Sequence, residues 1–228
     1  MWAIVSALPE EARELKEAIE SPRESSWAGG TLVQGRFAGK DVVLATCGVG
    51  KALAAMTTQY LIHAFSPQAL VFAGLAGALH SGLRQGDVIL GAELLQHDLD
   101  ATDFGFERGQ IPFTSIRILN SDARLLSAAL QVSAGGSRVV SGRILTGDRF
   151  IARRENDGLE YLTEELRGDA VEMEGAAVAL VCSLHKVPFL IMRTISDSGD
   201  TTAKEDFNGF LHRASANLKG ILSALLQQ

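Results

Sequence analysis

The chain has few of the residues that build disulfide-rich, metal-binding or membrane-spanning proteins. Its 228 residues include two cysteines, Cys47 and Cys182, which form no CxxC pair and are too few for a disulfide framework. The five histidines are scattered, without HExxH or another metal-ligand spacing. No apolar run reaches the ~20 residues that a membrane helix needs. We therefore expect a metal-free protein without a transmembrane segment.

Positive charge is also scarce. Lys and Arg number 21 against 27 Asp and Glu, which gives a formal net charge of −6. Sequence-independent nucleic-acid binding needs a basic surface to replace counterions, so this function is excluded. The first seven residues carry no basic region, and their apolar run is too short for a secretion signal. We expect a cytoplasmic protein with no nucleic-acid or membrane partner.

The residues that are present favour an α/β fold. The composition, 46% hydrophobic and 21% charged, is that of a globular protein, and the length suits a single domain over residues 1–228. Apolar runs of strand length alternate with helical spacing, which predicts a three-layer α/β/α sandwich. Because Ala38-Gly39-Lys40 marks a hairpin, the central sheet should be mixed. Expected strands are 2–7, 31–37, 41–47, 69–73, 88–90, 138–145, 170–173 and 189–195; expected helices are 10–19, 51–65, 122–133, 174–185 and 207–225.

Two segments should be irregular. Residues 21–30 are rich in Ser, Pro and Gly and predict a loop. Residues 97–114 form a long polar stretch, and such a stretch inside a compact domain is usually functional or packed on a partner.

The glycine motifs exclude two common cofactor folds. Gly48-Val49-Gly50-Lys51 lacks the earlier glycine of a P-loop and is followed by Ala52 where a P-loop has Ser or Thr. A strand-to-helix turn is the better interpretation. Gly74-Leu75-Ala76-Gly77 lacks the GxGxxG spacing of a dinucleotide site. We expect neither ATP nor NAD chemistry, and no cofactor.

Acidic residues follow three of the expected strands. Glu10-Glu11 opens a helix, where it would complement the helix dipole. Glu172 and Glu174 end another strand, where alternate side chains share one face and surface charge is the ordinary explanation. Asp197 lies beyond the strand 189–195. Ligand crevices in open α/β sheets lie beyond the carboxyl ends of strands, so one cleft could collect Glu11, Glu174 and Asp197.

Motifs spread over the whole chain carry a family resemblance. They are Ala7-Leu8-Pro9-Glu10-Glu11, Gly48-Val49-Gly50-Lys51, Gly74-Leu75-Ala76-Gly77, Val171-Glu172-Met173-Glu174-Gly175 and Arg193-Thr194-Ile195-Ser196-Asp197. In this order they resemble the nucleoside phosphorylase and nucleosidase superfamily. The stretch 97–106, with Gly109-Gln110-Ile111-Pro112 after it, is similar to that of the 5′-methylthioadenosine/S-adenosylhomocysteine nucleosidases.

The resemblance implies hydrolysis of the bond between adenine and a 5′-thioribose, without a cofactor. Breaking this bond builds positive charge on the ribose and negative charge on the base, so two acidic groups can divide the work. By resemblance, Glu11 would activate the water. Asp197, supported by Ser196, would deliver or share a proton at adenine N7.

The resemblance also implies the substrate contacts. Glu174 would accept hydrogen bonds from the ribose 2′- and 3′-hydroxyls, and Met173 would pack against the ribose. Phe150 and the backbone of Ile151 would hold adenine, and Phe207 would close over the 5′ substituent. The other implied substrate-binding residues are Leu8, Val49, Leu75, Glu172 and Arg193. Without the resemblance, core packing would explain Phe150 and Phe207.

Relatives with this pattern are homodimers, which predicts the same assembly here. Phe104 and Pro112 would complete the neighbour's 5′-thio pocket, where an apolar wall suits a thioether. Two departures from the pattern are notable. Leu75 replaces the usual serine, which removes a hydroxyl near the ribose and the water, and Leu8-Pro9 replaces Met and a polar residue.

Three other functions stay open. A phosphorylase would use phosphate in place of water, although Glu10-Glu11 near the first strand would repel it. A hydrolase of futalosine-type nucleosides shares the base and the ribose but lacks the thioether. A purine-binding protein without turnover would have no need of a water-activating base.

Overall fold

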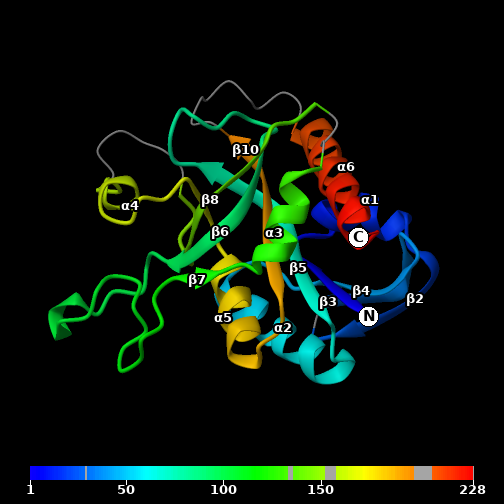
Figure 1. Ribbon diagram of the computed structural model, residues 1–228, viewed down its shortest axis with the longest axis horizontal. Helices are drawn as coiled ribbons and strands as arrows, with labels where there is room; N and C mark the ends of the chain where they lie inside the picture. Colours follow the sequence, from blue (N-terminus) through cyan, green and yellow to red (C-terminus); the bar gives the residue numbers. More distant parts are fainter. Residues whose placement is uncertain (29, 133–135, 152–157, 198–206, 228) are drawn as a thin grey trace.

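The computed structural model describes residues 1–28, 30–132, 136–151, 158–197 and 207–227 (Figure 1). Its strands are β1 (Trp2–Ser6), β2 (Glu20–Trp27), β3 (Gly30–Phe37), β4 (Lys40–Thr46), β5 (Ala69–Ala78), β6 (Val88–Gln96), β7 (Leu119–Asn120), β8 (Val139–Thr146), β9 (Ala170–Glu172) and β10 (Phe189–Asp197). Its helices are α1 (Pro9–Glu17), α2 (Lys51–Phe65), α3 (Ala123–Leu130), α4 (Tyr161–Glu164), α5 (Gly175–His185) and α6 (Phe207–Leu226), with a 3-10 turn, η1, at Thr102–Phe104.

The strands form one mixed sheet in the described part of the chain, in the order β10-β6-β8-β9-β5-β1-β4-β3-β2, with β7 beside β6. β1 runs parallel to β4 and β5, whereas β3 is antiparallel to both β2 and β4. β10 pairs with β5 as well as with β6, so β5, β9, β8, β6 and β10 close into a ring. The mixed sheet predicted from the hairpin is confirmed.

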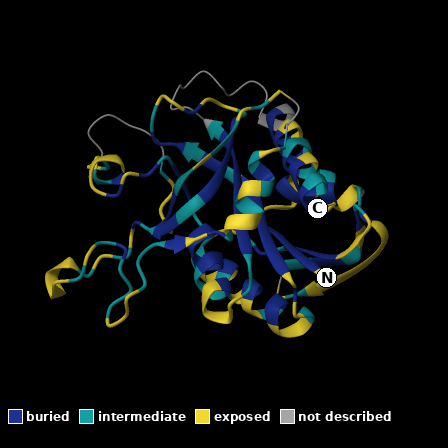
Figure 2. Ribbon diagram, in the orientation of Figure 1, coloured by how far each residue is buried: buried dark blue, intermediate teal, exposed yellow. Residues whose placement is uncertain are grey.

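Helices cover both faces of the sheet (Figure 1). α1, α3 and α6 pack on one face around an apolar cluster that includes Leu15, Ala129 and Leu222. α2 and α5 pack on the other face, where Leu61 and Val178 belong to a second cluster. Both clusters draw on opposite sides of the same strands, which are buried throughout the centre (Figure 2). The three-layer prediction is therefore confirmed.

Three local predictions were wrong, the simplest being the strand expected at 88–90, which continues to Gln96 as β6. Residues 20–27, expected to be mostly loop, form the edge strand β2; its side chains are almost all exposed, so it shows no apolar alternation to indicate a strand. β5 continues past residue 73 to Ala78, so the expected strand was too short and Gly74-Leu75-Ala76-Gly77 belongs to it. The glycine there serves close packing, because a Cβ on Gly74 would lie 2.7 Å from both Arg193 Nη1 and Glu11 Oε1.

Residues 97–118, between β6 and β7, form an arm that projects from the body of the molecule (Figure 1, green). Apart from η1 the arm consists of turns and irregular backbone, as the sequence predicted. Phe104 and Phe113 on it are 84% and 93% exposed. Within the described residues, no helix combines the length and the apolar character needed to span a bilayer.

Candidate active site

Glu11 lies at the first turn of α1 and is buried beside the end of β1. Its Oε2 accepts hydrogen bonds from the amides of Ala7 (3.0 Å) and Leu8 (2.9 Å), and its Oε1 accepts one from Leu75 on β5 (2.9 Å). Its neighbour Glu10 is exposed. Backbone amides that follow β1 and an amide within β5 thus hold the Glu11 carboxyl group in one orientation, which a role limited to the helix dipole does not require.

Glu172 ends β9 and is bonded entirely within the protein. Its Oε1 accepts from Thr146 Oγ1 and the Gly175 amide (2.9 Å), and its Oε2 accepts from the Glu174 amide (3.1 Å) and pairs with Arg193. The side chains of Glu172 and Arg193 are 2% and 1% exposed. This carboxylate is therefore built into the frame of the site, and its oxygens already have protein partners.

Glu174 lies at the N-cap of α5 and turns its carboxyl group toward the start of α2. Its Oε1 accepts a hydrogen bond from the Gly50 amide (2.9 Å), and its Oε2 lies 3.7 Å from Arg193 Nη2. β9 ends at Glu172, so Glu174 is not on a strand face as the sequence suggested; a tight turn brings the two carboxylates together. Both are buried, which overturns the surface-charge explanation.

Arg193 joins these side chains from the middle of β10. Its guanidinium group stacks over the Phe72 ring at 4.0 Å and lies close to Gly74, which also contacts Glu11. Glu11, Glu172, Glu174 and Arg193, here called the carboxylate cluster, therefore bring three buried acids to one buried cation. With every acid ionised, the cluster would carry more negative than positive charge, which favours binding of a cationic group.

Burial sets the protonation of this cluster. Desolvation raises the pKa of Glu11, although Arg193 and the three backbone amides oppose this rise. Desolvation and the nearby Glu172 raise the pKa of Glu174 to about 7, against the influence of Arg193 and the Gly50 amide. Two carboxyl groups therefore have proton affinities above that of an ordinary glutamate, which is a property of general acids and bases in enzymes.

The remaining predicted site residues differ in how far they are buried. Leu75 is half-buried next to Glu11, and Met173 is half-buried between Glu172 and Glu174. Ser196 Oγ donates to the Ala76 carbonyl oxygen (3.3 Å). Those that are exposed are Leu8 (38%), Val49 (47%) and Phe150 (76%). Ile151 is half-buried against an apolar cluster with Leu162 and Val171.

Two predicted residues lie at the edge of the described chain. Asp197 is the last residue of β10 and pairs with Gly77 of β5, so its backbone is at the carboxyl end of these strands. Phe207 begins α6. Their side chains lie outside the described part of the structure.

Sequence analysis missed a polar bridge beside the cluster. Lys51 Nζ lies 2.6 Å from Asp98 Oδ1 and 3.8 Å from Asp148 Oδ2. Asp148 Oδ1 accepts from the Lys51 amide (2.9 Å), and Asp98 Oδ2 accepts from the Asp148 amide (2.8 Å). This Lys51 bridge connects the start of α2 to the ends of β6 and β8. Lys51 was weighed only as a P-loop lysine, and nothing in its spacing indicated two aspartates far along the chain.

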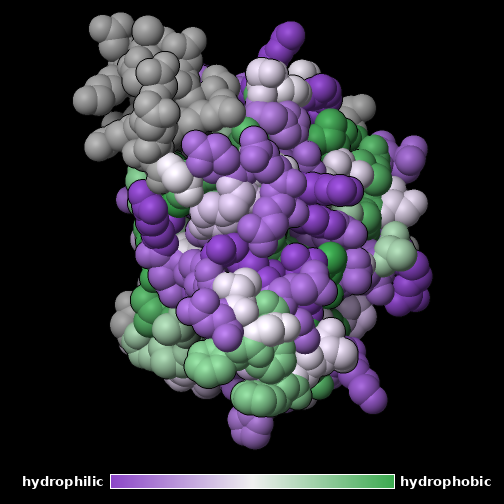
Figure 3. All heavy atoms as spheres, turned by 90° about the vertical axis from the view of Figure 1, so that its left-hand side faces the viewer, coloured by the Kyte–Doolittle hydropathy of each residue, from purple (hydrophilic) through white to green (hydrophobic). Residues whose placement is uncertain are grey.

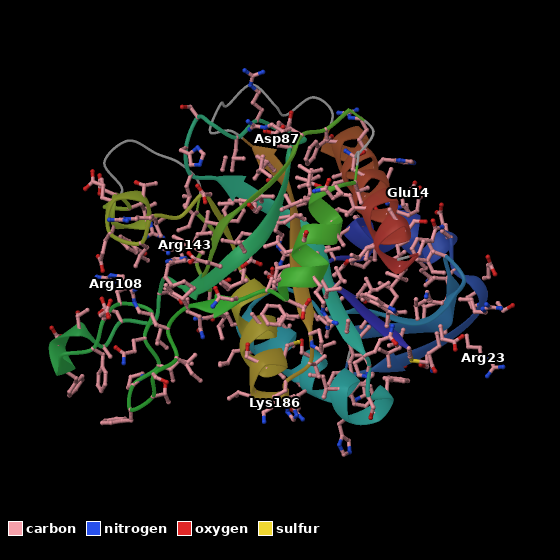
Figure 4. All side chains as sticks on the ribbon, in the orientation of Figure 1. Glu14, Arg23, Asp87, Arg108, Arg143 and Lys186 are labelled. Atoms are coloured by element: carbon pink, nitrogen blue, oxygen red, sulfur yellow. The ribbon has the colours of Figure 1, made fainter. Side chains whose placement is uncertain are left out.

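The root of the arm is fixed against α4. His97 Nδ1 is hydrogen-bonded to the Tyr161 hydroxyl (2.9 Å), and Arg108 lies over the Tyr161 ring at 4.7 Å. Arg108 also pairs with Asp100 (2.6 Å); Figure 4 labels it between the arm and α4. Phe104, at the end of η1, is exposed, and Pro112 further along the arm is half-buried.

Comparison with known proteins decides the family. Residues 2–227 match the phosphorylase superfamily. The chain belongs to this superfamily. The curated 5′-methylthioadenosine/S-adenosylhomocysteine nucleosidase of Shewanella sediminis is 36% identical to it over 228 residues, which cover 99% of this chain and 98% of the relative. The resemblance found from the motifs is confirmed.

Solved structures of the superfamily share the fold closely. The nucleosidase of Neisseria meningitidis, in complex with methylthio-immucillin-A, has a TM-score of 0.89 and 35% identity, and the match covers 99% of this chain and 98% of that one. The futalosine hydrolase of Helicobacter pylori has a TM-score of 0.88 and 30% identity, covering 99% of this chain and 96% of that one. The superfamily member described here thus resembles two kinds of nucleoside hydrolase.

Proposed function

We propose that this protein is an N-glycosyl hydrolase that cleaves 5′-methylthioadenosine and S-adenosylhomocysteine to adenine and the thioribose. The observation that carries the proposal is the Glu11 carboxyl group, buried and held by three amides beside a second carboxylate, Glu174, at the strand ends. The similarity to nucleosidases over 99% of the chain supports the substrate class.

Glu11 is suited to take a proton from water. A carboxylate offers about four lone-pair positions, and the amides of Ala7, Leu8 and Leu75 use two on Oε2 and one on Oε1. One position on Oε1 is left to accept a proton from the attacking water. Because burial raises the pKa of Glu11, the ionised group is a stronger base than an exposed glutamate.

Glu174 is suited to the sugar. Its two oxygens can accept hydrogen bonds from the vicinal ribose hydroxyls, and its charge favours the cationic ring of the transition state. Arg193 and the Gly50 amide fix its orientation (3.7 and 2.9 Å). Glu172 holds Arg193, so its contribution to binding would be the placement of Arg193 and Glu174.

Asp197 would complete the reaction by protonating or sharing a proton with N7 of the departing adenine. Its backbone position at the end of β10, next to β5, supports this role. Ser196, bonded to the Ala76 carbonyl oxygen, would hold the end of β10 that carries Asp197. Phe150 and Ile151, beyond the end of β8, would contact the base, and Phe207 would cover the 5′ group.

Water is favoured over phosphate as the second substrate. A phosphate dianion would need cations beside Glu11, whereas Arg193, the cation the described residues place against the cluster, is already paired with Glu172 and lies near Glu174. A dianion entering between buried carboxylates would be repelled.

A homodimer would bring the arm to the neighbour's site. Phe104 is 84% exposed on the arm, and Val49, Leu53 and Met56 form an exposed apolar stripe at the start of α2 (47%, 39% and 40%). Exposed apolar groups of this kind mark interaction sites. Figure 3 shows apolar side chains gathered at the lower end of the face that carries the arm, below a hydrophilic surface. Phe104 and Pro112 would then line the partner's 5′-thio pocket.

The decisive experiment is adenine release from 5′-methylthioadenosine in phosphate-free buffer. We expect multiple turnovers, with adenine and methylthioribose as products and no acceleration when phosphate is added. Strict dependence on phosphate would make the protein a phosphorylase. Binding of the nucleoside without turnover would make it a purine-binding protein.

A second candidate substrate is a futalosine-type nucleoside, which the similarity to the Helicobacter pylori hydrolase supports. Leu75, where the nucleosidase pattern has serine, alters the surface beside Glu11 and the ribose. Comparing kcat/KM on 5′-methylthioadenosine and aminofutalosine distinguishes the two substrates. A higher value on aminofutalosine would replace the first assignment with the second.

A further inference from the structure

The Lys51 bridge is adjacent to the sugar-binding carboxylate that the proposed reaction uses. Lys51 follows Gly50 directly, and the Gly50 amide donates to Glu174 Oε1 (2.9 Å). The Lys51 amide donates to Asp148 Oδ1 (2.9 Å). Two successive amides at the start of α2 therefore point to different carboxylates, and fixing the second restricts the direction of the first.

The direction of the Gly50 amide depends on the contacts that hold the Gly50 backbone. Gly50 has φ +103°, a conformation that residues with a side chain rarely adopt, and a Cβ there would lie 3.2 Å from Asp148 Oδ1. A glycine is free to move away from such a conformation unless something holds it. The Lys51–Asp148 hydrogen bond and the packing of α2 supply that restraint.

The bridge is partly buried and linked on several sides. The side chains of Lys51 and Asp98 are 18% and 28% exposed, so solvent screens their 2.6 Å contact less than it would a surface pair. The Asp148 amide donates to the second oxygen of Asp98 (2.8 Å). One lysine and two aspartates thus join three loops, those that follow β4, β6 and β8.

We propose that Lys51 is a positioning residue for the glycosidic reaction: through Asp98 and Asp148 it holds the Gly50 amide against Glu174, and so keeps this carboxylate directed at the ribose. Lys51 does not contact the substrate in this assignment. The inference rests on the proposed hydrolysis and adds to it a residue that controls the orientation and ionisation of Glu174.

The Glu174 pKa can report whether the Gly50 amide stays in contact with this carboxylate. Desolvation and Glu172 raise its pKa, as does Glu11 on α1, whereas Arg193 on β10 and the Gly50 amide lower it. The Cys47 thiol also lies near, but burial and the Glu174 charge raise its pKa to about 12, so it stays neutral. If the Gly50 amide swings away, Glu174 loses a stabilising donor, and its ionisation moves to higher pH.

The test compares pH profiles of kcat/KM for adenine release by the full-length protein and two variants. Lys51→Met removes the bridging cation, and Asp98→Ala removes its partner and the acceptor for the Asp148 amide. We expect both to lower kcat/KM about tenfold or more, because small misplacements of a binding group are costly. We expect both to move the acidic limb of the profile to higher pH.

The second variant separates positioning from simple charge effects. Loss of the Lys51 charge alone would raise the Glu174 pKa through space, but loss of the Asp98 charge alone would lower it. A shift to higher pH in both variants therefore requires the Gly50 contact. Opposite shifts, or unchanged limbs with only a lower melting temperature, would overturn the proposal.

Two controls complete the design. Lys51→Arg keeps the charge and hydrogen-bond donors, and we expect this variant to retain the acidic limb of the wild-type pH profile. Lys16→Met removes an ion pair of similar length, the exposed 2.9 Å contact with Glu24, and should leave the profile unchanged. If the wild-type protein releases no adenine, the proposed function fails; if it does and the variants keep its profile, only the role of Lys51 fails.

Discussion

The carboxylate cluster and the arm reverse the usual distribution of polar and apolar groups. In the cluster, Glu11, Glu172, Glu174 and Arg193 are all buried, whereas on the arm Phe104 and Phe113 are 84% and 93% exposed. Buried charge and exposed aromatic surface both oppose stability in an isolated chain. In the proposed function each would become favourable with a second molecule: a nucleoside whose sugar becomes cationic, or a partner chain that covers the arm.

The two regions differ in how they are held. Backbone amides, a hydroxyl and a guanidinium group satisfy the oxygens of Glu11 and Glu172. The arm is tied to the body mainly at its root, through His97, Arg108 and Tyr161. Substitutions in the cluster should therefore lower the stability of the folded chain. Substitutions at the tip of the arm should leave that stability nearly unchanged and affect only assembly or substrate binding.

The largest expected effect is on catalysis by the cluster. Glu11→Gln keeps the size of the side chain but removes the base, and we expect kcat for adenine release to fall by about 10²- to 10⁴-fold with little change in nucleoside binding. Steady-state kinetics and calorimetric binding measure the two quantities. The matched control is Glu10→Gln, at the exposed neighbouring position on α1. An active Glu11→Gln protein would remove Glu11 from the role of base.

The next effect concerns stability. Glu172→Ala removes the direct partner of Arg193 and leaves Glu174, 3.7 Å away, and Glu11 as the nearby acids. Removing one partner of a buried pair typically costs about 3–5 kcal/mol of the free energy of unfolding. For a chain of this size this corresponds to a fall of roughly 10 °C in melting temperature. Glu24→Ala breaks an exposed pair with Lys16 and should cost about 1 kcal/mol or less. Equal losses in the two variants would contradict the structural importance of the buried pair.

A smaller effect is expected from the arm. Phe104→Ala should leave the folded stability of the monomer nearly unchanged, because the ring is 84% exposed. If the ring lines a partner's pocket, KM for 5′-methylthioadenosine should rise about tenfold, the size expected for a well-buried aromatic contact. Adenosine, which lacks the thioether, serves as the control substrate and should be much less affected. Equal changes for both substrates would remove Phe104 from the 5′-thio pocket.

The most gradual effect is that of pH. The Glu174 pKa is raised to about 7. In the proposed reaction its ionised form would accept the ribose hydroxyls. We therefore expect kcat/KM to decline as the pH falls through about 7, well above the range of an ordinary glutamate. A profile that stays flat down to pH 5 would show that Glu174 ionises normally or is not required.

The raised pKa of Glu174 also makes the free energy of unfolding depend on pH. Between the ordinary glutamate range and about pH 7, the folded protein keeps a proton on Glu174 that the unfolded chain releases. The contribution of Glu174 to the free energy of unfolding should consequently decrease as pH rises through this window. Denaturation of wild-type and Glu174→Gln proteins across the window measures this difference.

The order of elements and the layer architecture were predictable from the sequence because they follow from local patterns. Apolar runs marked β1, β4 and the start of β5, and the spacing of residues 207–225 marked α6. The Asp122 cap was predictable as well: its side chain accepts from the amides of Arg124 and Leu125 (3.0 and 3.1 Å). The exposed edge strand β2 was missed, since it has a polar sequence and gains its structure from pairing with β3.

The candidate residues could be recognised from their motifs, but their roles depend on contacts between distant segments. Glu172 and Glu174 have the same side chain and are two positions apart, yet Glu172 is occupied by Thr146, Gly175 and Arg193 while Glu174 meets the Gly50 amide. No local pattern distinguishes these two environments. The Lys51 bridge was equally invisible, because Asp98 and Asp148 lie 47 and 97 positions from Lys51.

The sequence by itself determined the layer architecture and the family, because both depend on short-range periodicity and on motifs that recur in order. The tertiary structure decided which acids are buried, which oxygens already have partners and which amide holds each carboxylate. The physical reason is that desolvation and hydrogen bonding depend on separation in space, and the ring of β5, β9, β8, β6 and β10 brings together groups that the chain keeps far apart.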